Sequence, residues 1–497
     1  MKLSVHHLRE PLLEFGQGED TIPKEGLITG GPYSLRLGNT HLQTVRVGLV
    51  GTTETTKATE RFLRTVEQGV RSESGNAALA PDFPGFEIVF RSRIVRDARF
   101  DHAISSDALN SALRRRPDEA FKEVLTVFED ALGTVAERDA HPDIVICCIP
   151  KEVLDRCRTV QIRLAKSERA ELKRRELERL TGQTSLFDLR GNPWTLESAA
   201  DPTEEDLLSR DFRRALKAVA MRTRIPIQLA TPNLWDEGRR NQDPATRAWN
   251  LSVALFYKAG GIPWRVSTAH DDTCFVGISF HHLITTQRHI VYSSLAQAFS
   301  SDGDGFALRG EAIPWDGKTR TPHLSYENAH SLMSQVLDAY RERAGRNPVR
   351  IVVHKTSNYN DAERSGITDA CSAIPITELL TLRSGDFRMV REGTYPPHRG
   401  ALCRLGQAAF LFTSGYMPRY LTYPGPHVPV PIEIVGGDPE RAASAAADVL
   451  SLTKMNWNSA AASMALPITL SFARRVGGVM AELPREVEPH PSFRYYI

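Results

Sequence analysis

Short apolar runs alternate with longer helical patterns through the first half of the chain, and this alternation limits the fold more than any other feature. The runs VRVGLV (45–50), FEIVF (Phe86–Phe90) and IVICCI (144–149) are predicted strands. Helical patterns occupy 53–70 and 119–132. Strand and helix alternating at this spacing indicate βαβ units. The first half is therefore predicted to be a Rossmann-like α/β domain with a parallel sheet.

The middle of the chain is more polar before it becomes regular again. Residues 167–180 predict a solvated, charged helix, and 181–206 a surface excursion. A helix is expected over 207–223, a strand at Ile227–Ala230 and a helix at Pro244–Ala259, which ends at Gly260-Gly261.

A different pattern follows Pro263. Strands are predicted at 274–280 and 289–293, then a helix at 325–344 and a strand at 349–354. Several strands before the first helix favour a mixed sheet, as in an RNase H-like domain. We place the domain boundary near Gly260, which gives domains 1–260 and 261–497.

Composition narrows the class of protein without identifying it. A net charge of +2 neither suggests nor excludes a nucleic-acid partner. The six cysteines form no CxxC pair, so buried thiols are expected rather than zinc ligands or disulfides. No apolar run reaches the length of a membrane helix, and the N-terminus lacks a signal-peptide core. A cytoplasmic protein without a membrane partner is expected.

Several phrases in the second half resemble the PIWI domain of Argonautes. They are YKAGGIPWRV (257–266), TCFVGISF (273–280), RIVVHKTSNYNDAE (350–363), LTKMNWNSAA (452–461), LPITLSFARRVG (466–477) and PHPSFRYYI (489–497). Their order and spacing are those of the family, and the first half, with its PGFE segment, is similar to a MID domain. Because no room remains for N-terminal and PAZ domains, the resemblance is to short prokaryotic Argonautes.

The resemblance implies a pocket for the 5′ phosphate of a guide strand, made by Arg213, Lys217, Gln228 and Lys258. Arg213 and Lys217 are four residues apart on one helix, so both cations can reach one anion. The alternative is that these are exposed helix charges paired with Asp206 or Asp211. Ala254 departs from the family, because some relatives carry an amide there that helps to hold a cation.

The last residue, Ile497, is a candidate metal ligand. In the family the C-terminal carboxylate binds a divalent cation together with guide phosphates, and Mg²⁺ suits such oxygen ligands. The ending FRYYI also favours a buried terminus, since its side chains are costly to expose. A docked terminus without a metal is the alternative.

The residues that would make a slicing Argonaute catalytic are replaced. Ser279, Thr356 and Arg474 stand where the family's tetrad has acids or a final Asp or His. Two metal ions need several converging carboxylates, so no slicing is expected. Other polar residues of these phrases, Lys355, Lys454, Asn456 and Arg475, are candidates for contacts to the nucleic-acid backbone, although ordinary surface roles are equally open.

The resemblance implies a function in prokaryotic antiviral or anti-plasmid defence by abortive infection. A guide RNA would recognise single-stranded target DNA, and a heterodimeric partner with an APAZ region would carry the effector, a sirtuin-like or TIR NADase or a nuclease. Two alternatives stay open. One is an active nuclease that uses Asp271, Asp272, Asp361 or Glu363; the other is a structural subunit that binds no guide.

Overall fold

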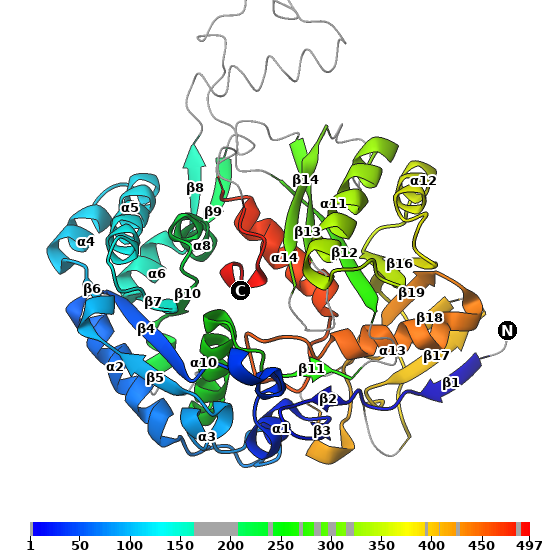
Figure 1. Ribbon diagram of the computed structural model, residues 1–497, viewed down its shortest axis with the longest axis horizontal. Helices are drawn as coiled ribbons and strands as arrows, with labels where there is room; N and C mark the ends of the chain where they lie inside the picture. The colour runs from blue at the N-terminus through cyan, green and yellow to red at the C-terminus, as the bar shows by residue number, and fades with distance from the viewer. Residues whose placement is uncertain are drawn as a thin grey trace, which may run out of the picture.

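Two large β-sheets with helices packed around them organise the computed structural model (Figure 1). The structure describes residues 3–163, 207–236, 242–267, 272–282, 290–296, 305–314, 323–392, 396–406, 408–423, 428–483 and 489–497. Within these ranges, no helix has both the length and the hydropathy that crossing a membrane would require.

The first sheet is parallel. Its strands are β4 (Thr44–Gly51), β5 (Arg93–Arg96), β7 (Ile144–Cys148) and β10 (Ile227–Ala230), in the order β10-β7-β4-β5, and β6 (His102–Ala103) pairs with the end of β4. β4 comes first in sequence and lies between β5 and β7, so successive crossovers run in both directions from it. This arrangement confirms the predicted Rossmann-like domain.

Helices cover the parallel sheet on both faces, and β7 is therefore buried along its whole length. The best-defined helix starts have side-chain caps: Thr52 caps α2, Ser105 caps α4 and Asp243 caps α10. The helices of this half are α1 (Pro23–Gly30), α2 (Thr53–Gln68), α3 (Phe86–Phe90), α4 (Ser106–Leu113), α5 (Pro117–Ala136), α6 (Lys151–Cys157), α8 (Phe212–Ala220), α9 (Pro232–Trp235) and α10 (Pro244–Ala259), with 3₁₀ turns η1 (Tyr33–Thr40), η2 (Ala98–Phe100) and η5 (Met221–Thr223).

The second sheet is mixed, as predicted for an RNase H-like domain. β12 (Thr273–His282), β13 (Ile290–Ala296) and β14 (Ala307–Pro314) are antiparallel neighbours, and β12, β15 (Arg350–Lys355) and β16 (Ile376–Ser384) are parallel. Three further strands from this half of the chain extend the sheet beyond β16. They are β19 (Ile432–Gly436), β18 (Ala408–Leu411) and β17 (Ala401–Leu405).

Alternate residues of the mixed sheet enter two different cores. Cys274 and Val276 of β12 pack with α11 (Tyr326–Ala344) and α12 (Asp361–Ala370). Phe275 faces the other side, in the core that contains α13 (Ala442–Leu452) and α14 (Ile468–Met480). The remaining elements of this half are the 3₁₀ turns η6 (Pro418–Tyr420), η7 (Pro439–Arg441) and η8 (Phe493–Tyr495).

The N-terminal segment lies with the second half, although we assigned it to the first domain. β1 (Leu3–His7) pairs antiparallel with β17, and β2 (Leu13–Glu14) lies between β3 (Glu19–Asp20) and β11 (Arg265–Val266). A division by sequence order misses this pairing, because strands hundreds of residues apart form one sheet.

Two predicted elements are wrong. The run Phe86–Phe90 is the helix α3, in which Phe86, Val89 and Phe90 are buried at helical spacing; Gly85, with φ 118°, starts it. The predicted helix 207–223 begins as strand β9 (Leu207–Asp211), paired with β8 (Thr159–Arg163), and becomes helical only at Phe212. The predicted helix 167–180 and excursion 181–206 lie outside the described residues.

A buried charge cluster fastens the N-terminal segment to the second half. The Glu10 carboxylate accepts hydrogen bonds from Arg399 Nε at 3.0 and 3.1 Å and forms an ion pair with Lys454 Nζ at 2.6 Å. Burial raises the pKa of Glu10, but Arg399 and Lys454 together outweigh burial and hold this pKa below its usual value. One carboxylate thus stabilises two cations that are 3% and 1% exposed.

Glu10→Gln is expected to lower the free energy of unfolding by about 3 kcal/mol at pH 7, because it removes the negative charge that both buried cations contact. Urea unfolding measures this change. Since the pKa of Glu10 is lowered in the folded state, the difference from wild type should shrink as pH falls through that pKa. Glu60→Gln is the control, because it removes only an exposed pair with Arg64; an equal loss in both variants would contradict the role of the cluster.

Candidate functional site

Cationic side chains from both halves of the chain line one cavity of about 320 Å³. Its walls come from α8 of the first half, and from α14, the 456–459 turn and the C-terminal residues of the second. The lining residues are Asp211, Arg213, Arg214, Lys217, Asn458, Arg475, Val479, Tyr496 and Ile497. We call this cavity the junction pocket.

Helix α8 presents its cations to the junction pocket because its opposite face is buried. Phe212, Ala215 and Leu216 pack into the core, whereas Arg213 and Arg214 are exposed and Lys217 is half-buried. The helix starts where it does because the Asp211 side chain accepts a hydrogen bond from Arg214 N at 3.0 Å.

A second contact ties the start of α8 to the end of α14. The Glu482 carboxylate accepts from Arg210 Nε at 2.7 Å and from the backbone N–H of Asp211 at 3.0 Å. Further along α14, Gly478 leaves room for the guanidinium of Arg214, whose Cζ would lie 3.0 Å from an added Cβ. These contacts fix the two helices that face each other across the junction pocket.

Two lysines, Lys217 and Lys258, lie behind the exposed Arg213 and Arg214. Lys217 Nζ donates to the backbone oxygen of Tyr496 at 3.1 Å, and Lys258 Nζ donates to Ile227 O at 2.8 Å and to Gln228 Oε1 at 2.7 Å. Burial lowers the pKa of Lys217 to about 8, helped by Arg475 and Arg213. Burial also holds the pKa of Lys258 well below its usual value, and Lys217 and Arg475 add to that effect.

The mutual repulsion of these cations makes the junction pocket suited to an anion. Asp211 is the one carboxylate side chain among the lining residues that the structure describes, and it faces several positive charges. Arg supplies two parallel N–H donors to phosphate or carboxylate, and Lys supplies a mobile point charge. Binding of an anion with several oxygens would therefore lower the electrostatic energy of these cations.

The predicted 5′-phosphate residues thus occupy two layers. Arg213 and Lys217 line the junction pocket, while Lys258 and Gln228 lie behind it, with the ammonium of Lys258 between β10 and Lys217. The predicted partner Asp211 caps the helix rather than neutralising Lys217. Asn250, about one helical turn before Ala254, accepts a hydrogen bond from Ala460 N at 3.0 Å.

The C-terminal residues form one wall of the junction pocket, and their predicted burial is confirmed. Tyr496 and Ile497 are 1% and 2% exposed. Tyr495 Oη donates to Arg224 O at 2.6 Å, and Tyr496 Oη donates to His490 O at 2.8 Å. These two hydrogen bonds anchor the end of the chain against both the first half and the preceding turn.

The residues present do not build a magnesium site on their own. No group of three His, Cys, Asp or Glu side chains able to hold a metal occurs among the described residues. Beside Ile497, the lining side chains Arg213, Lys217 and Arg475 would repel a divalent ion. Magnesium fits here only where an anion brings its own oxygen ligands.

The three predicted tetrad positions lie on elements that pack together. Ile278 of β12 pairs with Lys355 of β15, so the next residues are Ser279, still within β12, and Thr356, directly after β15. Helix α14 crosses β12 so closely that a Cβ on Gly277 would lie 2.0 Å from Thr469 O. Arg474 follows on this helix, and its side chain is outside the description.

The acids considered for a nuclease lie elsewhere or are neutralised. Asp272 is at the opposite end of β12 from Ser279 and pairs with Arg346. Glu363, 1% exposed, forms an ion pair with Lys355 at 2.5 Å and accepts from Leu324 N. Asp361 begins α12, and Asp271 lies outside the described residues.

Two of the four predicted backbone contacts are wrong. Lys355 is 1% exposed, paired with Glu363, and Lys454 is 1% exposed, paired with Glu10, so neither ammonium can reach a nucleic acid. Asn456 instead shapes a turn, where its amide donates to Ser459 Oγ at 3.2 Å. Arg475 is exposed and lines the junction pocket.

Sequence reasoning missed Asn458 and Arg214, which also line the junction pocket. Asn458 stands in the LTKMNWNSAA phrase, and Arg214 follows Arg213 directly, so both signals were present. The sequence alone, however, does not show which polar residues of such a segment point into the pocket.

Solved Argonaute structures are similar to this chain in fold. One is Clostridium butyricum Argonaute bound to a guide DNA (5′ deoxycytidine) and a 19-mer target DNA, with a TM-score of 0.62, 14% identity and coverage of 98% of this chain and 54% of that one. Aa-Ago with externally bound siRNA follows, with a TM-score of 0.56, 14% identity and coverage of 99% and 56%. For A. aeolicus Argonaute the values are 0.55, 15%, 98% and 54%.

The chain therefore has an Argonaute-like fold and spans about half the length of these structures. No protein-family profile matches it, and no curated protein does.

Lys217→Met is expected to stabilise the ligand-free protein by about 1–2 kcal/mol at pH 7, because it removes a buried cation at the cost of one hydrogen bond. The pKa of Lys217 is lowered from 10.5 to about 8, so the unfolded state binds more protons between these values. Wild-type stability should consequently rise with pH across this window, and less steeply in Lys217→Met. Denaturant unfolding at several pH values tests this, with exposed Lys122→Met as the control; identical slopes would contradict it.

Proposed function

We propose that this chain holds a guide strand by its 5′ phosphate and uses it to recognise a complementary strand without cutting it. The observation that carries the proposal is the junction pocket, where Arg213, Lys217 and Arg475 converge on one cavity between the two sheets. Such a donor set suits a terminal phosphate, which offers several oxygens and two negative charges.

The phosphate would relieve the repulsion that the free pocket contains. Arg213 and Arg475 are exposed and supply N–H donors from opposite walls, one on α8 and one on α14. Lys217, held by Tyr496 O, would contribute charge from the floor, and Lys258 would add its field from behind. A bound phosphate raises the pKa of both lysines, so protons are taken up as the guide binds.

The Argonaute-like fold supports a nucleic-acid guide over any other phosphate ligand. Base pairing would then read the target, while the protein would recognise duplex shape and backbone. A guide RNA and a single-stranded DNA target are the pairing that short prokaryotic Argonautes imply. We extend the proposal to Mg²⁺ only in the guide-loaded state, where phosphate oxygens would join the Ile497 carboxylate.

The replaced acids support recognition without cleavage. Ser279 of β12 and Thr356, which directly follows β15, offer hydroxyls where two carboxylates would have to hold metal ions. Glu363 is already committed to Lys355 in the core. Target recognition would then act through a second subunit. We propose an APAZ-containing partner with a sirtuin-like, TIR or nuclease effector, in a cytoplasmic antiviral defence complex.

Lys217→Ala is expected to weaken binding of a 5′-phosphorylated guide by about 10- to 100-fold, because a charge-assisted contact to the phosphate is lost. Binding of the same guide with a 5′ hydroxyl should change little. Filter binding with the two guides measures both affinities, and exposed Lys122→Ala on α5 is the matched control. Equal losses for the two guides would move Lys217 from the terminal phosphate to a general basic surface.

A guide-loaded protein is expected to bind labelled complementary DNA yet leave it intact in Mg²⁺ or Mn²⁺. The double variant Ser279→Asp, Thr356→Asp should also leave it intact, because two carboxylates alone do not complete a two-metal site. Gel analysis of the target checks both. A product cut opposite the middle of the guide would overturn the proposal, and so would a failure of the wild-type chain to bind any guide.

A further inference from the structure

Another cavity, of about 530 Å³, lies beyond the carboxyl ends of the parallel sheet in the first half. It opens where β4 ends at Gly51 and β7 ends at Cys148. Its walls are the first turns of α2, one face of α4, the start of α6 and the short helix α9. None of its lining residues lines the junction pocket. We call this cavity the switch-point crevice.

The order of the strands explains why a crevice opens at this place. β4 lies between β5 and β7, so the chain crosses to one side of β4 to form β5 and to the other side to form β7. As a result, α2 packs into the core on one face of the sheet, and α4 and α6 pack into the core on the other. Open α/β sheets bind their ligands in the crevice that such diverging helices leave at the carboxyl ends of the strands.

Close contacts fix the floor of the switch-point crevice. Thr55 Oγ1 donates to Cys148 O at 3.1 Å and so ties the first turn of α2 to the end of β7. A Cβ on Gly51 would lie 2.7 Å from the same oxygen, so glycine is needed for the two strand ends to approach this closely. Ala58 and Leu109 line the crevice from α2 and α4 and are buried, which makes its inner part apolar.

Trp235 gives the independent sign of a ligand. It lines the crevice and is half-buried, whereas each of the other three tryptophans that the structure describes is 2% exposed or less. The turn that carries it is fixed by Arg247, whose Nη1 donates to the backbone oxygens of Asn233, Leu234 and Asp236 at 3.1, 2.7 and 3.0 Å. An indole held in place and left partly open to a cavity offers its face to a flat ring.

The rim of the crevice is polar and carries a net negative charge. Glu54, Glu152 and Asp236 supply three carboxylates, and Arg61 and Lys151 supply two cations. Glu54 and Glu152 stand in the first turns of α2 and α6, where the helix ends already favour their negative charge. The rim therefore disfavours a phosphate or another anion. It favours a neutral ligand with hydroxyl groups, since hydroxyls donate to carboxylates.

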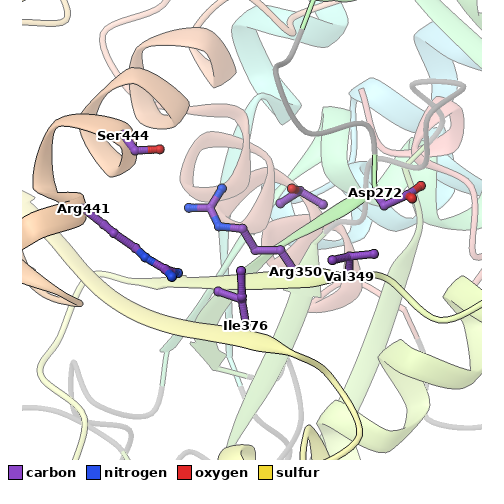
Figure 2. A pocket seen from close by; sticks show the side chains of 7 residues that line it. Asp272, Val349, Arg350, Ile376, Arg441 and Ser444 are labelled. Carbon is purple, nitrogen blue, oxygen red and sulfur yellow. The ribbon is translucent and has the colours of Figure 1, made fainter.

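The cavity at the start of β12, β15 and β16 lacks this combination of features (Figure 2). Arg350 pairs there with Glu378 and Asp448, and Arg441 lies 3.8 Å from Asp438. These charges are met by groups of the chain itself, and none of the lining residues that the structure describes is aromatic. Of the two cavities, only the switch-point crevice thus combines an open aromatic ring with an apolar floor and a polar rim.

We propose that the switch-point crevice binds a free, uncharged nucleoside. The base would stack on Trp235 and lie over Ala58 and Leu109, and the ribose hydroxyls would donate to the rim carboxylates Glu54 and Glu152. A sugar alone lacks the flat ring, and a nucleotide brings a phosphate that the rim repels. Because the crevice and the junction pocket share no residue, nucleoside binding does not depend on guide binding.

Equilibrium dialysis of the full chain with each of the four radiolabelled ribonucleosides tests the site. At least one of them should bind. Its free base and ribose should each displace it at least about tenfold less well, because each makes only part of the contacts. Its 5′-monophosphate should also displace it at least about tenfold less well, because the rim is negative. Displacement reports on this site alone, so a monophosphate that binds in the junction pocket does not affect the result.

Three variants connect binding to the named side chains. Trp235→Ala should weaken nucleoside binding by about tenfold or more, because the stacking surface is lost, and Trp235→Phe should retain most of the affinity. Glu54→Gln, at an exposed position, should bring the affinity of the monophosphate closer to that of the nucleoside. Tyr326→Ala, which removes an aromatic side chain 39% exposed on α11, is the matched control and should bind normally.

Three results would overturn the proposal. They are the absence of binding by every nucleoside, displacement by ribose or by the monophosphate as effective as by the nucleoside itself, and wild-type affinity in Trp235→Ala. A chain that loads no guide should still bind the nucleoside, so this proposal and the proposed function fail independently.

Discussion

The repulsion between cations at the junction pocket is the constraint on which the arrangement of the two halves depends. Lys217 is half-buried and Lys258 is buried beside Arg475, and their pKa values are lowered first by burial and then by the neighbouring cations. The surrounding contacts have to hold them against that repulsion. The Glu482 carboxylate does so at the start of α8, and Tyr496 O and Gln228 Oε1 accept from the two ammonium groups. Stability is thus lowered at the place where these cations are held together.

The end of the chain completes the junction pocket, because it contacts both halves and cannot move independently of them. Tyr495 reaches Arg224 in the first half, and Phe493 packs edge-to-face on Phe472 of α14, so the last residues bridge both sides of the junction. A displaced terminus would remove the acceptor of Lys217 together with one wall of the pocket. The ordering of the chain end at Ile497 and the protonation of Lys217 are therefore coupled.

The sequence allowed the fold class to be predicted, but only part of the site. Arg213 and Lys217 could be placed together because four residues on one helix fix their separation, whatever surrounds the helix. The burial of Lys355 and Lys454 could not be predicted, because the carboxylates that pair with them lie on other elements. Glu363 is on α12, and Glu10 is near the other end of the chain.

The same reason explains the two wrong elements. FEIVF is apolar at four of its five positions, so its pattern fits a strand and a buried helix equally well, and the backbone conformation of the flanking residues decided between them. LLSRD (Leu207–Asp211) became a strand because β8 pairs with it. In one case the outcome depended on the backbone conformation of the flanking residues, and in the other on a strand that is distant in sequence. The hydrophobic periodicity of a segment reports neither.

The mixed sheet is held together by contacts that do not depend on charges at Ser279 and Thr356. Carboxylates at Ser279, on β12, and at Thr356, directly after the neighbouring parallel strand β15, would repel each other unless metal ions lay between them. Hydroxyls at these positions remove that repulsion, and the Lys355–Glu363 pair beside them closes the core without any metal. The close approach of α14 to Gly277 is unaffected by either change, since it depends on the missing Cβ alone. The contact between α14 and β12 is therefore independent of the side chains at Ser279 and Thr356, and the same helix contributes Arg475 and Val479 to the junction pocket.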